Sequence, residues 1–77
     1  MITEAKMKRI LAGGWTAKAV ATEACVKPAK YYQWEAGSAY YYLSKEEAER
    51  VAAVLGTAVE EIATPRGAAV IHESASA

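Results

Sequence analysis

The chain has 77 residues, no formal net charge, 53% hydrophobic and 23% charged residues, which is the composition of one small globular domain and not of a disordered segment. A domain of this size has no room for a deep catalytic cleft between two lobes, and its single cysteine excludes an internal disulfide. The longest stretches without charge, at residues 36–44 and 51–59, are half as long as a bilayer span requires. The sequence therefore predicts a cytoplasmic, soluble, single-domain protein with no membrane partner.

The two halves of the chain carry opposite charge. Residues 1–34 hold six lysines and arginines against two glutamates, whereas residues 35–77 hold three against seven. This split indicates one basic and one acidic face, although a chance dipole on a solvated surface explains it equally well. The 18 alanines and the absence of Asp, Asn and Phe fit either a biased genome or an engineered sequence.

The first predicted helix begins near Thr3 and Glu4, because a hydroxyl can cap free N–H groups and an acid suits the positive end of the helix dipole. The glycine pair at 13–14 ends this helix. Three apolar residues at i, i+3 and i+4 predict its apolar face: Met7, Ile10 and Leu11.

Two more helices follow with a tight connection between them. Thr16 is the candidate N-cap of a helix over residues 17–24. Pro28 suits the first position of the next helix, where its missing N–H costs nothing, and Gly37 ends that helix. The stretch 38–43, which contains three consecutive tyrosines, is predicted to be a loop.

A capping box opens the fourth predicted helix, because the hydroxyl of Ser44 precedes Glu47 by three residues. An apolar stripe at helical spacing runs behind it and ends at Gly56. Thr57 and Glu60 predict a second capping box, which would start a short fifth helix.

Five short helices predict an all-α bundle over residues 1–63. Residues 64–77 are predicted to be a C-terminal tail, either partly disordered or carrying a short dimerisation strand over 68–72. Nine residues lie on consistent helical faces and are predicted to form one core: Trp15, Val20, Ala21, Val26, Tyr31, Trp34, Val51, Leu55 and Ile62.

Only residues 25–27 join the second and third predicted helices, and this spacing is typical of a helix-turn-helix. Ala21 is a small residue in the middle of the second predicted helix. Together with the runs Tyr-Gln-Trp-Glu-Ala-Gly at 32–37 and Val-Leu-Gly-Thr-Ala-Val-Glu-Glu-Ile at 54–62, this sequence resembles the Xre/Cro-type family of phage repressors and bacterial regulators. The resemblance covers roughly residues 6 to 62.

The sequence departs from the family pattern at three places. Cys25 occupies a turn position that is usually Gly, because φ is positive there, at a cost of roughly 1 kcal/mol. The family's first helix often supplies an Arg that pairs with the Glu matched by Glu35, but direct alignment puts Ile10 there and Arg9 one residue earlier. The sequence leaves open whether that pair forms. The loop after Gly37 is also a few residues longer than usual.

The resemblance implies a sequence-specific transcriptional regulator, a repressor or Cro-like protein, that places its third helix in the major groove of duplex DNA. Since the sequence carries no cofactor motif and indicates no small-molecule ligand, the expected mechanism is occupancy of an operator. The resemblance also implies base reading by the first, second and sixth residues of the third helix, Pro28, Ala29 and Gln33, with Tyr32 beside them. Gln33 alone of the three has a hydrogen-bonding fork suited to an adenine edge. Phosphate contacts are expected from Thr16, Ala17, Lys18, Lys27, Lys30, Ser38 and Tyr40.

Two other functions remain open at this stage. In an interaction module of the same fold, the apolar pair 28–29 and the tyrosines at 40–42 would bind a protein partner, and Gln33 would be a solvated helix residue. An engineered scaffold without DNA binding is the third reading. Lysines 18, 27 and 30 gathered on the exposed side of the third helix would favour DNA, whereas scattered lysines would favour the interaction module.

Catalysis and metal binding are not predicted. His72 has no second ligand at metal-binding spacing, and the sequence lacks phosphate-loop and nucleophile motifs. Cys25 is expected to be a small apolar filler. A homodimer is expected, because one such domain reads only a few base pairs. The residues predicted to form its contact are Val59, Ile62, Val70 and Ile71.

Overall fold

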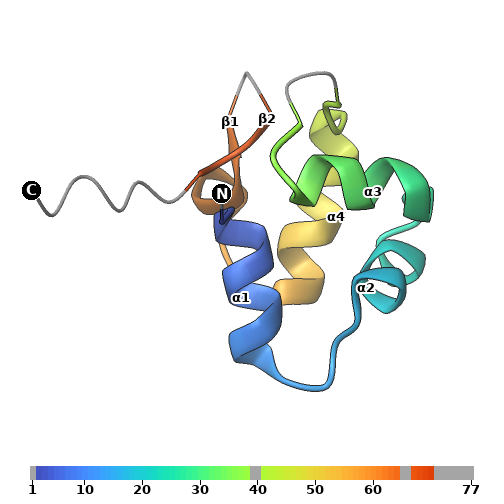
Figure 1. The fold of residues 1–77 in the computed structure, drawn as a ribbon, viewed down its shortest axis with the longest axis vertical. Coiled ribbons are helices and arrows are strands. Elements are labelled where there is room, and N and C mark those ends of the chain that lie inside the picture. Colours follow the sequence, from blue (N-terminus) through green and yellow to red (C-terminus); the bar gives the residue numbers. More distant parts are fainter. Residues whose placement is uncertain (1, 39–40, 65–66, 71–77) are drawn as a thin grey trace, which may run out of the picture.

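The computed structural model describes residues 2–38, 41–64 and 67–70. Over these residues the chain forms five helices and one two-stranded sheet (Figure 1). Their bounds are α1 Glu4–Ala12, α2 Ala17–Glu23, α3 Pro28–Glu35, α4 Lys45–Leu55, α5 Val59–Ile62, β1 Ala63–Thr64 and β2 Gly67–Ala68. The predicted all-α fold is confirmed, with the small sheet as an addition. No helix among the described residues is both long and apolar enough to span a bilayer.

Side-chain caps set the starts of three helices, as the sequence predicts. The hydroxyls of Thr3 and Thr16 accept hydrogen bonds from the third N–H of α1 and α2, at 3.2 and 3.1 Å. Ser44 and Glu47 form the predicted capping box at α4. α3 has no side-chain cap and begins with Pro28 instead.

The capping box predicted for the fifth helix is wrong. α5 begins one residue later than expected, with Ala58 at the N-cap and no side-chain cap. The N–H of Thr57 instead bonds the carbonyl of Ala52 at 3.0 Å, and Gly56 has φ of 69°. This is the geometry that closes the end of α4, so Thr57 belongs to the preceding helix terminus.

α4 lies in the middle of the molecule, between α1 and the α2–α3 pair (Figure 1). The two largest core side chains, Trp34 and Tyr31, come from α3, and their ring centroids lie 5.7 Å apart. Seven of the nine predicted core residues are buried, and Trp15 and Leu55 are partly buried against them. The core therefore holds the inner face of α3 and leaves its other face outside.

The apolar face predicted for the first helix is wrong. Ile10 and Leu11 are 56% and 76% exposed, and the buried residue of α1 is Ala5. The helix turns Ala5 and Arg9, four residues apart, toward the body, because Arg9 pairs with the buried Glu35. A long-range ion pair thus overrides the local hydrophobic pattern.

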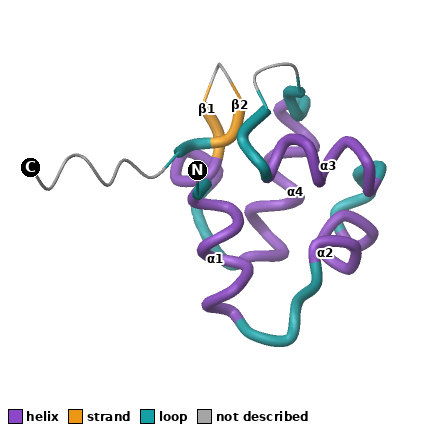
Figure 2. The backbone as a smooth tube through the Cα atoms, viewed as in Figure 1, coloured by secondary structure: helices purple, strands orange, loops and turns teal. Residues whose placement is uncertain are grey.

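The segment after α5 folds back on the same chain. β1 and β2 pair antiparallel, with Ala63 opposite Ala68 and Thr64 opposite Gly67. Ala69 then accepts a bond from the N–H of Glu4 at 2.8 Å and donates one to Ile62 at 2.9 Å. Figure 2 shows the sheet beside the start of α1.

The described part of the tail strand, which is predicted to pair with a second copy, makes its contacts within its own chain. Residues 67–68 pair with 63–64, and Val70 bridges to Thr3, which is close to the N-terminus in sequence and adjacent to the sheet in space. Gly67 has φ of 123°, which suits glycine. The rest of the predicted strand, at 71–72, lies outside the described residues.

Candidate nucleic-acid interface

A tight turn joins α2 to α3 as the spacing predicts. The N–H of Val26 bonds the carbonyl of Ala21 at 2.8 Å, which closes α2 with a Schellman-type turn. Cys25 has φ of 57° and is the non-glycine residue with positive φ among those described. Ala21 and Val26 are buried, so α3 packs closely on α2.

Cys25 is exposed, so its prediction as an apolar filler is wrong. The buried apolar position belongs to its neighbour Val26, which is 3% exposed. The left-handed backbone at Cys25 carries the strain expected of an L residue.

Replacing Cys25 by glycine is expected to stabilise the domain by up to about 1 kcal/mol, because glycine removes the left-handed strain but has more freedom in the unfolded chain. Urea denaturation of C25G beside the unchanged protein measures this. Alanine at the same position keeps the Cβ and should bring no gain. A C25G variant less stable than the unchanged protein would contradict the assignment of strain.

A buried polar network fixes α3 against α1. The Arg9 guanidinium donates to both carboxylate oxygens of Glu35, at 2.9 Å each, and to the carbonyl of Trp15 at 3.3 Å. The Tyr31 hydroxyl donates to the same carboxylate at 2.5 Å. Thr3 donates to the carbonyl of Glu35 at 2.6 Å. The pair that the sequence left open therefore forms, and Arg9 makes it.

The charges of this network follow from its contacts. The hydrogen bond that Arg9 makes to Glu35 raises the pKa of Arg9 above its usual value. Burial, followed by the hydrogen bond to Glu35, raises the pKa of Tyr31. Arg9 is thus a cation and Tyr31 a neutral donor, and together they hold the C-terminal end of α3.

The outward face of α3 carries the residues predicted to read bases. Ala29, Tyr32 and Gln33 are exposed, and Pro28 is half-buried at the first helical position. Because Tyr31 and Trp34 point into the core, this face is the one that the fold leaves available.

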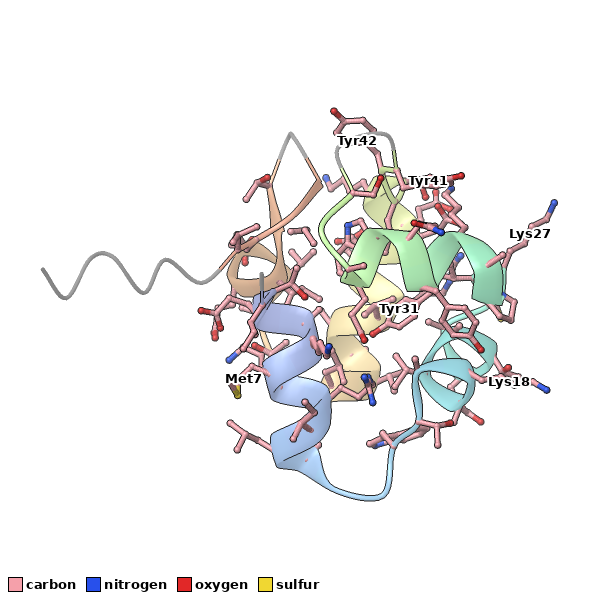
Figure 3. The ribbon with its side chains drawn as sticks, viewed as in Figure 1. Met7, Lys18, Lys27, Tyr31, Tyr41 and Tyr42 are labelled. Atoms are coloured by element: carbon pink, nitrogen blue, oxygen red, sulfur yellow. The ribbon has the colours of Figure 1, made fainter. Side chains whose placement is uncertain are left out.

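Lysines flank this face on one side of the molecule. Figure 3 shows Lys18 on α2 and Lys27 at the start of α3 projecting away from the body, on the side opposite Met7 of α1. Both are exposed and have no ion-pair partner among the described residues. Lys30 is half-buried and pairs with Glu47 of α4 at 2.8 Å. Two of the three predicted lysines therefore lie on one side of the molecule without an ion-pair partner in the described part of the chain, and the third is paired with Glu47.

The other residues predicted to contact phosphates differ in their exposure to solvent. Thr16 is exposed, with its hydroxyl engaged at the N-cap of α2. Ala17 and Ser38 are half-buried. Tyr40 lies outside the described residues. Its neighbours Tyr41 and Tyr42 are 40% and 49% exposed, and Figure 3 shows them at one end of the molecule.

Sequence reasoning missed two contacts that shape this surface. Arg50 of α4 donates to the carbonyl of Ala24 at 2.7 Å and so holds the end of α2 at the turn. The Lys30–Glu47 pair ties α3 to α4. Each joins residues far apart in the sequence, so no local pattern could indicate them.

The residues predicted to form a dimer contact lie near the end of the chain. Val59 and Val70 are half-buried, and Ile71 lies outside the described residues. Ile62 is fully buried in the chain's own core, so its side chain offers no surface to a second copy.

Within the part of the chain that the structure describes, no three His, Cys, Asp or Glu side chains come together as metal ligands would. His72 lies outside that part.

A family model described as helix-turn-helix matches residues 6–62, which is most of the chain and includes both helices of the turn. The chain therefore belongs to the Xre/Cro-like helix-turn-helix family. It is a DNA-binding domain of the regulator type, in a family that is not typically enzymatic. No curated protein and no solved structure matches it.

Proposed function

We propose that this protein is a sequence-specific transcriptional regulator, a repressor or Cro-like protein, that acts by occupying an operator. α3 enters the major groove with Gln33 toward the base edges. The observation that carries the proposal is the exposed face of α3 with Gln33, on the side of the molecule where the exposed Lys18 and Lys27 project. The cytoplasmic location expected from the sequence remains a prediction.

Specificity in this proposal comes mainly from Gln33. Its amide presents a donor and an acceptor, which match N7 and the N6 amino group of adenine in the major groove. Ala29, four residues earlier on the same face, can contact a thymine methyl group. Pro28 has no hydrogen bond to give a base, and Tyr32 has one hydroxyl. With one such donor–acceptor amide per subunit, we expect a modest preference for the operator over other DNA.

Affinity comes from contacts to the phosphates. Lys18 and Lys27 supply exposed cations on one side of the molecule, and Thr16, Ala17 and Ser38 are expected to contact further phosphates. Each phosphate neutralised releases counterions, so that log K falls by about 0.9 per contact for each unit of log salt.

Gln33→Ala and Lys27→Ala are expected to act differently. Q33A should relax the choice of base at one operator position by about 1–3 kcal/mol, whereas K27A should weaken binding to all sequences alike and reduce the salt slope by about 0.9. Binding titrations on matched and single-substituted duplexes measure both effects, with Lys6→Ala on α1 as the control. Equal weakening of every duplex by Q33A would contradict base reading.

A protein-interaction module is the second candidate. The exposed Tyr32, Tyr41 and Tyr42 favour it, since their side chains are 40–49% exposed. Duplex binding that does not depend on salt, or no duplex binding at low salt, is the result that would select it.

We propose further that two copies bind half-sites about one helical turn apart. Of the residues predicted to form the dimer contact, Val59 is the one that lies in a described helix and is only half-buried. It is the first residue of α5. A duplex with two half-sites should bind at least about tenfold tighter than one half-site, and Val59→Lys should abolish the difference. Sedimentation measures the assembly directly. A monomer that binds both duplexes equally would contradict the dimer.

A further inference from the structure

An ion pair lies at the edge of the proposed DNA-binding face. The Lys30 ammonium of α3 contacts a carboxylate oxygen of Glu47 in α4 at 2.8 Å, and the two side chains are 35% and 18% exposed. Lys30 precedes Gln33 by three residues, so the two are neighbours on the helix surface. A groove placed against Gln33 therefore brings DNA close to this pair.

The Glu47 carboxylate is held in place from its other side. The oxygen that contacts Lys30 also accepts the N–H of Ser44 at 2.9 Å, and the Glu47 N–H donates to the Ser44 hydroxyl at 3.1 Å. The hydrogen bond from Lys30, followed by the bond to the Ser44 backbone, holds the pKa of Glu47 below its usual value. Glu47 cannot turn away from Lys30 without breaking the capping box that starts α4.

We propose that Glu47 is an internal competitor for the DNA phosphate that Lys30 would otherwise bind, and that it sets the affinity of the domain for DNA. This inference rests on the proposed function. An approaching phosphate meets an ammonium already engaged by a fixed anion, and it meets the negative charge of that anion as well. Lys30 therefore contributes less to binding than Lys18 and Lys27.

The variant E47Q separates the charge of this side chain from its structural role. Glutamine at the same position can still accept the Ser44 N–H, so the capping box is kept, while Lys30 loses its anion. E47Q is expected to bind duplex DNA about three- to fivefold tighter at about 50 mM salt and to steepen the salt slope by up to about 0.9.

Two further variants identify the cause. Glu46→Gln removes the same charge from an exposed neighbour in the first turn of α4 and should leave the slope unchanged. Lys30→Met keeps most of the aliphatic stem and removes the cation, so adding E47Q to K30M should not steepen the slope further. Far-UV circular dichroism checks that each variant stays folded.

The probe is one duplex selected for binding to the unchanged protein, titrated over a range of salt concentrations. A steeper slope for E47Q that disappears in the K30M background supports competition through Lys30. An unchanged slope for E47Q, or an equal gain in both backgrounds, overturns it while leaving the proposed function intact. Failure of the selection to yield any duplex that the unchanged protein or a variant binds overturns both.

Discussion

Replacing Trp34 by alanine is expected to unfold the domain. Trp34 is 1% exposed and packs at the centre of the core beside Tyr31. Truncation of a buried tryptophan costs about 3–5 kcal/mol. The whole free energy of unfolding of a domain of this size is similar, about 3–5 kcal/mol. Far-UV circular dichroism and amide dispersion in NMR spectra measure the loss of structure.

The matched control is Tyr32→Ala, in the same helix but on the face that points away from the core. Tyr32 is 43% exposed on the outer face of α3, so its removal should cost less than about 1 kcal/mol. A W34A variant that still melts cooperatively, within about 1 kcal/mol of the unchanged protein, would contradict the assignment of Trp34 to the core.

The second large effect is expected from Arg9→Met. The Arg9 and Glu35 side chains are only 16% and 7% exposed, so R9M leaves a carboxylate buried without its cation. Removing one partner of a buried pair costs about 3–5 kcal/mol. Urea denaturation measures the loss, and we expect a value near the lower limit, about 3 kcal/mol, because the pair keeps some access to water.

Two comparisons isolate the buried charge as the cause. Lys8→Met breaks the more exposed pair of Lys8 with Glu61, whose side chains are 27% and 55% exposed, and should cost much less stability than R9M because water screens this pair. The double variant R9M/E35Q replaces the stranded carboxylate by a neutral amide that can still accept the Tyr31 hydroxyl, and should recover a large part of the loss. An R9M variant no less stable than K8M would contradict the network.

Local chemistry in the sequence is sufficient to predict most of the helices. Hydroxyl caps at Thr3, Thr16 and Ser44, and Pro28 at the start of α3, act within one turn, so the residues next to them determine each helix start. The positive φ at Cys25 is predicted from the family resemblance, because the matching turn position is usually glycine.

The errors arise where a distant partner decides the local structure. Arg9 turns α1 toward Glu35, 26 residues away, and so exposes Ile10 and Leu11. The strand at Gly67–Ala68 finds its partner in Ala63–Thr64 and continues to Thr3, which no periodicity in the tail indicates. Neither contact leaves a signal in a short window of sequence.

The candidate site divides in the same way. The outward position of Ala29, Tyr32 and Gln33 follows from helical spacing, because Tyr31 and Trp34 occupy the opposite face. The neutralisation of Lys30 by Glu47 could not be predicted, since the two residues are 17 apart and belong to different helices. A count of lysines and arginines in the sequence therefore overstates the number of cations available to bind DNA phosphates.

The most direct test of DNA binding through α3 is selection from a random duplex library by the purified protein, followed by titration of the enriched duplex against salt. We predict one enriched sequence motif and, for three to five phosphate contacts in each subunit, a log–log salt slope of about −2.7 to −4.5 per subunit. Gln33→Ala should lose the preference at one position of that motif. No enriched motif, together with no duplex binding at about 50 mM salt, would contradict the proposed function.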